Sequence, residues 1–154
     1  MRVIIALILS LAGVAHAEVR TGYRNGKAVR IRVTQVGWAE VELETAKAFR
    51  KMARAAESAG FSLTIRSGFR SHERQKELYR AWRAGWGNKA ARPGFSNHES
   101  GRALDIDVDG GVLSWLRRNG RRFGFQATVR GEPWHWEFTP PKRVARATSK
   151  RHRS

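Results

Sequence analysis

Histidine and acidic side chains gather in the central and C-terminal parts of this 154-residue chain. Two of the histidines are His98 and His135, and six carboxylates lie between them or close by, at positions 99, 105, 107, 109, 132 and 137. The protein as a whole is strongly basic, with 30 Lys and Arg residues against 13 Asp and Glu and a net charge of +17. Carboxylates that gather around two histidines in such a chain indicate a site for a divalent cation.

A catalytic zinc ion needs three protein ligands and a fourth position for water, whose pKa it lowers to about 7. A separate carboxylate must take the proton of that water and hand it to the leaving amine. Two histidines and one aspartate as ligands, with one glutamate as base, would meet this need without cysteine, and the chain has no cysteine.

Alternating residues predict how these side chains come together. In residues 103–109, apolar residues separate Asp105, Asp107 and Asp109, which is the period of a half-buried strand with the three carboxylates on one face. Residues 134–138 alternate in the same way and put His135 and Glu137 on one face of a second strand. If the two strands are neighbours in one sheet, His135 lies beside Asp105.

Three motifs in this order resemble the LAS metallopeptidases, the group of lysostaphin, D-alanyl-D-alanine carboxypeptidases and sonic hedgehog. The resemblance is strongest to the VanY-type D-alanyl-D-alanine carboxypeptidases, and it covers residues 40–139. It rests on Ser67-Gly68-Phe69-Arg70-Ser71 with Gln75, on Ser96-x-His98-x-x-Gly101-x-Ala103-x-Asp105, and on Glu132-x-Trp134-His135-x-Glu137.

The resemblance implies a role for each matched residue. It implies that His98, Asp105 and His135 bind Zn2+ and that Glu132 is the general base. Arg70 would steady either the developing oxyanion or the terminal carboxylate of the substrate.

The resemblance also implies that Gln75 and Ser96 line the substrate cleft. Phe69 stands where the family often has tyrosine, so a hydrogen bond from that hydroxyl is absent.

The activity that this resemblance implies is removal of the terminal D-Ala from peptidoglycan stem peptides ending in D-Ala-D-Ala, by hydroxide attack on the amide. Two alternatives stay open. One is an endopeptidase of the L-Ala-D-Glu type that cuts inside the stem peptide. The other is a non-catalytic, zinc-containing module that binds the cell wall, although Glu132 favours an enzyme.

Several prominent residues have simpler interpretations. We expect Asp107 and Asp109 to be solvated or to support the metal ligands, since the remaining oxygen ligands of a calcium loop are missing. We expect Glu137 to support the site rather than to catalyse, and His72 to lie at the surface. Trp115, Trp134 and Trp136 lie at core spacing, whereas Trp82 and Trp86 either flank the cleft or join the core.

The pattern of the whole chain predicts an α+β domain over residues 18–140, a small antiparallel sheet with helices packed against it. Asn25-Gly26 predicts a hairpin within residues 18–36. Helices are expected over residues 39–59, 71–84 and 111–122, and further strands over 61–66, 103–109 and 134–138.

The two ends of the chain predict its location. Residues 1–17 have a charged start, an apolar run too short to span a bilayer and the small-x-small sequence Ala15-His16-Ala17, which is typical of a secretory signal peptide. Residues 141–154 contain six Lys and Arg and no acid, so we expect a disordered basic tail. We expect an exported, periplasmic or secreted monomer without a transmembrane segment. Its basic surface would face the anionic cell wall rather than a specific nucleic acid, because no nucleic-acid-binding module is recognised.

Overall fold

A computed structural model of the chain describes residues 17–140. The predicted signal peptide lies outside the described residues apart from Ala17, and the predicted basic tail, residues 141–154, lies outside them entirely. Within residues 17–140, no helix is both long and apolar enough to cross a bilayer.

The N-terminal part of the domain is a three-stranded antiparallel sheet. Its strands are β1 (Glu18–Arg24), β2 (Lys27–Val36) and β3 (Ala39–Glu42), in that order across the sheet. The predicted turn is confirmed: Asn25 and Gly26 connect β1 and β2 with φ of 50° and 77°, as a type I′ hairpin turn requires.

The first helix begins later than predicted. Residues 39–42 form β3 instead, and α1 (Leu43–Glu57) follows it directly. The Glu42 carboxylate marks the boundary because it accepts a hydrogen bond from the backbone N–H of Thr45 at 2.9 Å, which satisfies a free donor of the first turn. One face of α1 is buried, with Ala46, Met52 and Ala56 fully inaccessible to solvent.

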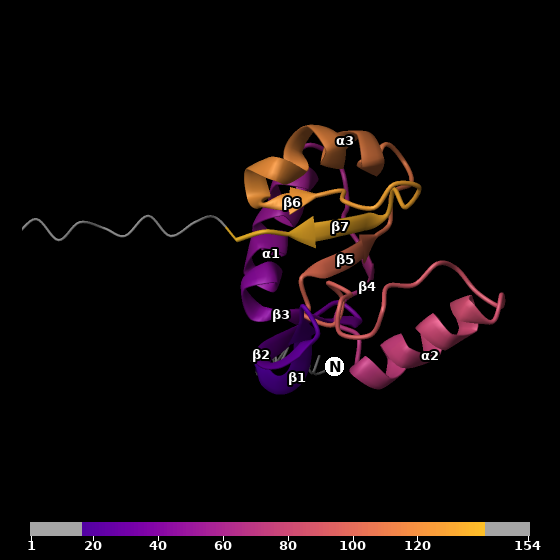
Figure 1. Cartoon of the computed structure of the whole chain (residues 1–154). Coiled ribbons are helices and arrows are strands. Elements are labelled where there is room, and N and C mark those ends of the chain that lie inside the picture. The colour runs from indigo at the N-terminus through magenta and orange to yellow at the C-terminus, as the bar shows by residue number, and fades with distance from the viewer. Residues whose placement is uncertain (1–16, 141–154) are drawn as a thin grey trace, which may run out of the picture.

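A second antiparallel sheet has the strand order β4-β5-β7-β6. The strands are β4 (Ile65–Ser67), β5 (Ala103–Ile106), β6 (Phe125–Gln126) and β7 (His135–Phe138). The α+β class is thus confirmed, but the strands form two sheets rather than one, and β5 is shorter than the 103–109 predicted. In Figure 1, α1 lies behind the second sheet and α3 lies above it.

The hydrophobic core lies between the second sheet, α1 and α3 (Val112–Asn119), which continues as the 3-10 helix η1 (Gly120–Phe123). Trp115 and Trp136 belong to it, as predicted. The prediction for Trp134 is wrong: its side chain is 42% exposed, because it precedes β7 and lies at the rim of a hollow rather than on the inner face of the strand.

Helix α2 (His72–Arg83) projects away from both sheets in Figure 1. Its N-cap is Ser71, as predicted, whose hydroxyl accepts a hydrogen bond from the Arg74 N–H at 3.2 Å. Gln75 is the one fully buried side chain of this helix. The helix therefore contributes its first turn, rather than a long apolar face, to the rest of the domain.

The N-terminal sheet contacts the two loops that precede α2 and β5. The N–H of Phe69 donates to the carbonyl of Glu40 at 2.6 Å, and the N–H of Glu42 donates to the carbonyl of Gly101 at 3.2 Å. Gly68 and Gly101 pack so closely on β3 that a side chain on either would collide with it. The first sheet thereby fixes the backbone of both loops.

Candidate metal centre

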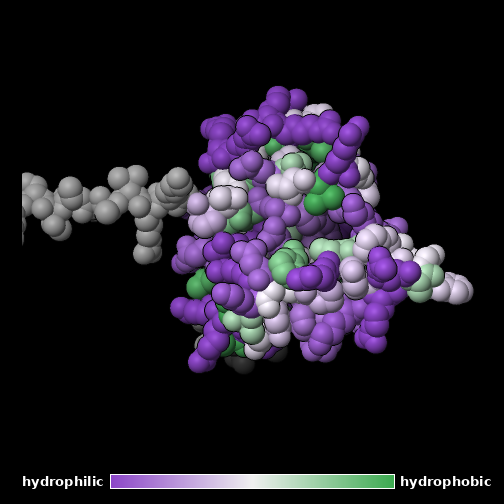
Figure 2. Space-filling model, viewed as in Figure 1, coloured by the Kyte–Doolittle hydropathy of each residue, from purple (hydrophilic) through white to green (hydrophobic). Residues whose placement is uncertain are grey.

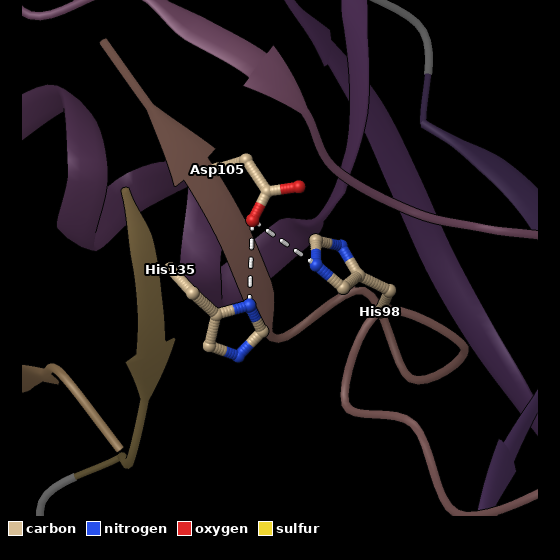
Figure 3. A group of neighbouring side chains, drawn as sticks. All are labelled: His98, Asp105 and His135. Carbon is tan, nitrogen blue, oxygen red and sulfur yellow. Dashed lines mark hydrogen bonds and ion pairs between the residues drawn. The ribbon is translucent and has the colours of Figure 1, made fainter. Parts of the chain in front are cut away.

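His98, Asp105 and His135 converge from three segments of the chain. His98 lies on the loop before β5, Asp105 lies in β5, and His135 is the first residue of β7. Asp105 and His135 are direct partners in the β5–β7 ladder, which confirms the neighbouring strands expected from the alternating sequence. One oxygen of Asp105 points between the two imidazole rings in Figure 3.

Two of the three distances among these atoms match those around a tetrahedral zinc ion. Oδ1 of Asp105 lies 3.4 Å from Nε2 of His98 and 3.3 Å from Nδ1 of His135, and all three ligand atoms lie within 4.8 Å of one another. Two ligands about 2.0–2.1 Å from a tetrahedral zinc ion lie about 3.3–3.4 Å apart. Both histidines are buried. Because the three side chains already lie this close together, the separate segments of the chain form one preassembled donor set.

The opposite nitrogen of each ring is held by an acceptor, which selects the nitrogen that faces the metal position. Nδ1–H of His98 donates to the carbonyl of Gly68 at 2.8 Å, so its Nε2 is free for a metal. Nε2–H of His135 donates to Oε1 of Glu137 at 3.0 Å, so its Nδ1 is free. Acceptors of this kind orient metal-binding histidines and raise their basicity. The supporting role expected for Glu137 follows directly from this contact.

The side chains of His98, Asp105, His135 and Glu137 form a tight ionic cluster. Burial alone would raise the pKa of Asp105, but hydrogen bonds from His135 and His98 outweigh it and hold that pKa well below its usual range. Burial alone would lower the pKa of His135, but hydrogen bonds with Asp105 and Glu137 raise it to about 9. The hydrogen bond from His135 lowers the pKa of Glu137 to about 2.

Arg70 and Gln75 form a second group beside the metal position. Nη1 of Arg70 donates to Oε1 of Gln75 at 3.0 Å, and Nε2 of Gln75 donates to the carbonyl of Ala91 at 2.7 Å. The backbone N–H of Arg70 donates to the carbonyl of His98 at 3.1 Å. Burial lowers the pKa of Arg70, and the Asp105 carboxylate opposes that shift. A half-buried guanidinium close to His98 and Asp105 is a strong, fixed donor for an anionic group.

Glu132 and Ser96 occupy different surroundings. The carbonyl of Glu132 accepts a hydrogen bond from the His135 N–H at 3.1 Å, and its half-buried carboxylate is among the charges that act on Arg70. Ser96 is buried, and its hydroxyl accepts a hydrogen bond from the His98 N–H at 3.3 Å. Ser96 thus holds the loop of His98, in addition to any contact with substrate.

Glu99 and His72 have a part in the site that the sequence did not reveal. Glu99 is fully buried, and Nδ1 of His72 lies 2.6 Å from its Oε1, so the expected surface position of His72 is wrong. Glutamate is seldom fully buried, and nothing in the sequence links Glu99 to residue 72. The ring of His72 is held inward by Tyr23, which stacks on it with centroids 3.9 Å apart.

Asp105, Asp107 and Asp109 line one hollow of about 470 Å³ together with Arg66 and Trp134. The prediction that they share one face of a strand is wrong, because β5 ends at Ile106, and Ile106 and Val108 line the same hollow. Asp107 forms an ion pair with Arg66, with Nη2 of Arg66 2.8 Å from Oδ2 of Asp107. Figure 2 shows a largely hydrophilic face with a recess between the part that carries α3 and the part that carries α2.

A family model described as VanY, D-alanyl-D-alanine carboxypeptidase, matches residues 39–141, which is most of the chain. The chain belongs to the VanY family. The match covers almost the same residues as the resemblance seen in the sequence. It excludes β1 and β2 but includes every candidate site residue.

Individual VanY relatives agree with this assignment. A D-alanyl-D-alanine carboxypeptidase of Enterococcus faecalis is 32% identical over 116 residues, 54% of this chain and 42% of that protein. The chain spans less than half the length of the two curated relatives that it matches, 42% and 47%.

Solved structures of the family share the fold. VanYB in complex with D-alanine-D-alanine is 25% identical with a TM-score of 0.59, covering 70% of this chain and 77% of that one. A mutant of the vancomycin-resistance D,D-pentapeptidase VanY in complex with Zn(II) is 25% identical with a TM-score of 0.57, covering 70% and 78%. The LdcB LD-carboxypeptidase is 26% identical with a TM-score of 0.57, covering 64% and 59%.

Proposed function

We propose that this VanY-family protein is an exported, zinc-dependent peptidase that removes the terminal D-Ala from peptidoglycan stem peptides ending in D-Ala-D-Ala. The observation that carries the proposal is the donor set of His98, Asp105 and His135 at the spacing of a tetrahedral zinc ion. The VanY relatives in complex with D-alanine-D-alanine and with Zn(II) support the substrate and the metal.

The three ligand atoms would be Nε2 of His98, Oδ1 of Asp105 and Nδ1 of His135, since the other ring nitrogens are already bonded. A zinc ion held there would supply a water that ionises near neutral pH and would polarise the scissile carbonyl. Glu132 takes the proton of the attacking water and later donates it to the leaving amine. Its position at the start of the turn that leads into β7 supports this role, because the hydrogen bond from the His135 N–H to the Glu132 carbonyl fixes that turn.

Arg70 binds an anionic group of the substrate. Two groups of the proposed substrate suit it, the carboxylate at the end of the peptide and the oxyanion that develops on the cleaved amide. Gln75 orients the guanidinium, and the bond from Gln75 to the Ala91 carbonyl fixes Gln75 in turn. A half-buried group that is already oriented loses little entropy on binding, which supports a role in substrate selection.

Product masses test the proposed reaction. The zinc-loaded protein is incubated with a stem pentapeptide ending in D-Ala-D-Ala and with the tetrapeptide that lacks the last residue. Loss of one alanine from the pentapeptide alone is the expected result. Cleavage of the tetrapeptide at its terminal L,D bond would instead match the activity named for LdcB.

Two other results would replace the proposal. An internal cut would identify an endopeptidase of the L-Ala-D-Glu type, and binding of the wall without any cut would identify a non-catalytic module. In the same assay, Asp105→Asn serves as the matched control, because it keeps the size of the side chain but removes a charged ligand.

We further propose export through the segment 1–17 and attachment to the anionic wall through the basic residues 142–154. Exported protein should begin at Glu18 when its mass is measured, and retention of Met1 would contradict cleavage. Deleting residues 142–154 should weaken adhesion to isolated walls, in a salt-dependent way, and spare hydrolysis of a soluble peptide. Equal adhesion of both forms would remove the role of this segment.

A further inference from the structure

A fully buried carboxylate holds together the loop that carries His98. Oε1 and Oε2 of Glu99 accept hydrogen bonds from the N–H of Gly94 at 3.0 and 2.8 Å, and Oε2 accepts another from the N–H of Ser96 at 3.3 Å. Glu99 has no exposed surface at all. These bonds satisfy buried backbone donors that would otherwise be left unpaired, so the carboxylate determines the path of the loop around His98.

His72 ties the same carboxylate to the other half of the site. It is the first residue of α2, two positions after Arg70 and three before Gln75, and its Nδ1–H donates to Oε1 of Glu99 at 2.6 Å. The backbone bond from Arg70 to the His98 carbonyl is a second link between the same segments. The metal-binding loop and the segment with the proposed substrate-binding residues are therefore joined at two points.

The N-terminal hairpin holds His72 in place. The ring of Tyr23 in β1 stacks on the His72 ring with centroids 3.9 Å apart and an angle of 11° between the planes. The N–H of Tyr23 also donates to the carbonyl of Glu99 at 3.0 Å. Tyr23 lies outside the residues 39–141 that match the VanY family, so this contact comes from a part of the chain that the family model does not include.

We propose that Tyr23, His72 and Glu99 are positioning residues that fix His98 relative to Arg70. None of the three touches the metal position. They act through the backbone of the His98 loop and through the first turn of α2. This inference rests on the proposed zinc peptidase function, but its first readout is zinc affinity, which is measured without substrate.

Two substitutions at His72 separate its two contacts. His72→Phe keeps a ring that can stack on Tyr23 but loses the donor to Glu99, whereas His72→Asn keeps a donor near the position of Nδ1 but loses the stack. Glu73→Gln is the matched control, because Glu73 lies in the same turn of α2 and its exposed side chain pairs with Lys76 at 3.8 Å.

Zinc dissociation constants are measured on metal-free protein by competition with a chelator. We expect His72→Phe to bind zinc about tenfold more weakly, at the low end of the range for direct partners of a metal ligand, because His72 acts through Glu99 and not on His98 itself. His72→Asn should recover most of this loss, and Glu73→Gln should match the original protein. Tyr23→Leu removes the stack alone and should weaken zinc binding by up to about tenfold; it provides the same test if His72→Phe does not fold.

Turnover at saturating zinc separates positioning from simple support of the fold. His72→Phe should lower kcat more than it raises KM, since the spacing between Arg70 and the metal matters most in the transition state. The inference would be overturned if His72→Phe and Tyr23→Leu both kept a zinc affinity and a kcat within twofold of the original protein. It would also be overturned if these variants had a lowered Tm but an unchanged zinc affinity. If the original protein binds zinc but cuts no stem peptide, the proposed function fails, while the zinc comparison still decides this inference.

Discussion

Zinc and a proton should compete for Nδ1 of His135, and this competition can be measured. In the metal-free protein, hydrogen bonds with Asp105 and Glu137 outweigh burial and raise the pKa of His135 to about 9. A histidine must be neutral to bind a metal. At pH 7 the ring is therefore protonated before zinc arrives, and binding must displace that proton into solvent.

The size of the effect follows from the distance between the pKa and the working pH. Each pH unit below the pKa lowers the apparent zinc affinity about tenfold, or 1.36 kcal/mol. Between pH 9 and pH 7 the affinity should therefore fall about 100-fold, and above pH 9 the contribution of His135 should level off.

Calorimetric titrations with zinc in two buffers of different ionisation enthalpy give the number of protons released. We expect about one proton at pH 7 and fewer above pH 9. Glu137→Gln removes the negative charge of the acceptor that helps to raise the pKa of His135, so fewer protons should be released at pH 7. It should also bind zinc about 10–100-fold more weakly at pH 9.5, where the proton no longer competes. Glu57→Gln, at the exposed end of α1, is the control.

The same pKa predicts how the stability of the metal-free protein depends on pH. Because the folded-state pKa of His135 is raised from 6.5 to about 9, its contribution is fully present below pH 6.5 and is lost as the pH rises through 9. The free energy involved is on the order of 3 kcal/mol, shared with the carboxylates that cause the shift. Urea unfolding at pH 6 and 9.5 measures it. For the zinc titrations, an affinity that does not change from pH 6.5 to 9, with no proton released, would show that no proton on His135 competes with zinc.

The remaining predictions concern catalysis, substrate binding and the packing of the loop. Glu132→Gln should lower kcat about 10²–10⁴-fold with zinc affinity nearly unchanged, and full turnover would exclude Glu132 as the base. Arg70→Lys should lower kcat/KM in steady-state assays, because a lysine cannot reproduce the fork of donors that Gln75 orients; equal kcat/KM would show that Arg70 needs only its charge. Gly94→Ala should destabilise more than Gly85→Ala in urea unfolding, since both have positive φ (87° and 82°) but only a Cβ at position 94 would lie 2.9 Å from another backbone atom. Equal losses of about 1–2 kcal/mol would show that the close approach to the hairpin costs nothing.

The proximity of Asp105 and His135 was predicted correctly because the relevant sequence pattern is local. Alternation in two short strands put Asp105 on one face of β5 and His135 on one face of β7, and pairing the strands brings these faces together. The hairpin turn at Asn25-Gly26 was predicted for a similar reason, because positive φ at two successive positions demands those residue types.

The sequence did not predict the location of residues whose partners are distant in the chain. His72 at the start of a polar helix is typical of a surface residue, and only the folded chain brings Tyr23 and Glu99 to it. Strand β3 was missed because its four residues are too few to show a period and lead straight into α1. The division into two sheets likewise depends on which strands pair across long stretches of chain, which residue patterns do not specify.

Anomalous diffraction from crystals of the zinc-loaded protein tests the central claim most directly. We predict a single zinc peak about 2.0–2.2 Å from Nε2 of His98, Nδ1 of His135 and an oxygen of Asp105. No peak among these three side chains, or ligation through the nitrogens now bonded to Gly68 and Glu137, would contradict the account.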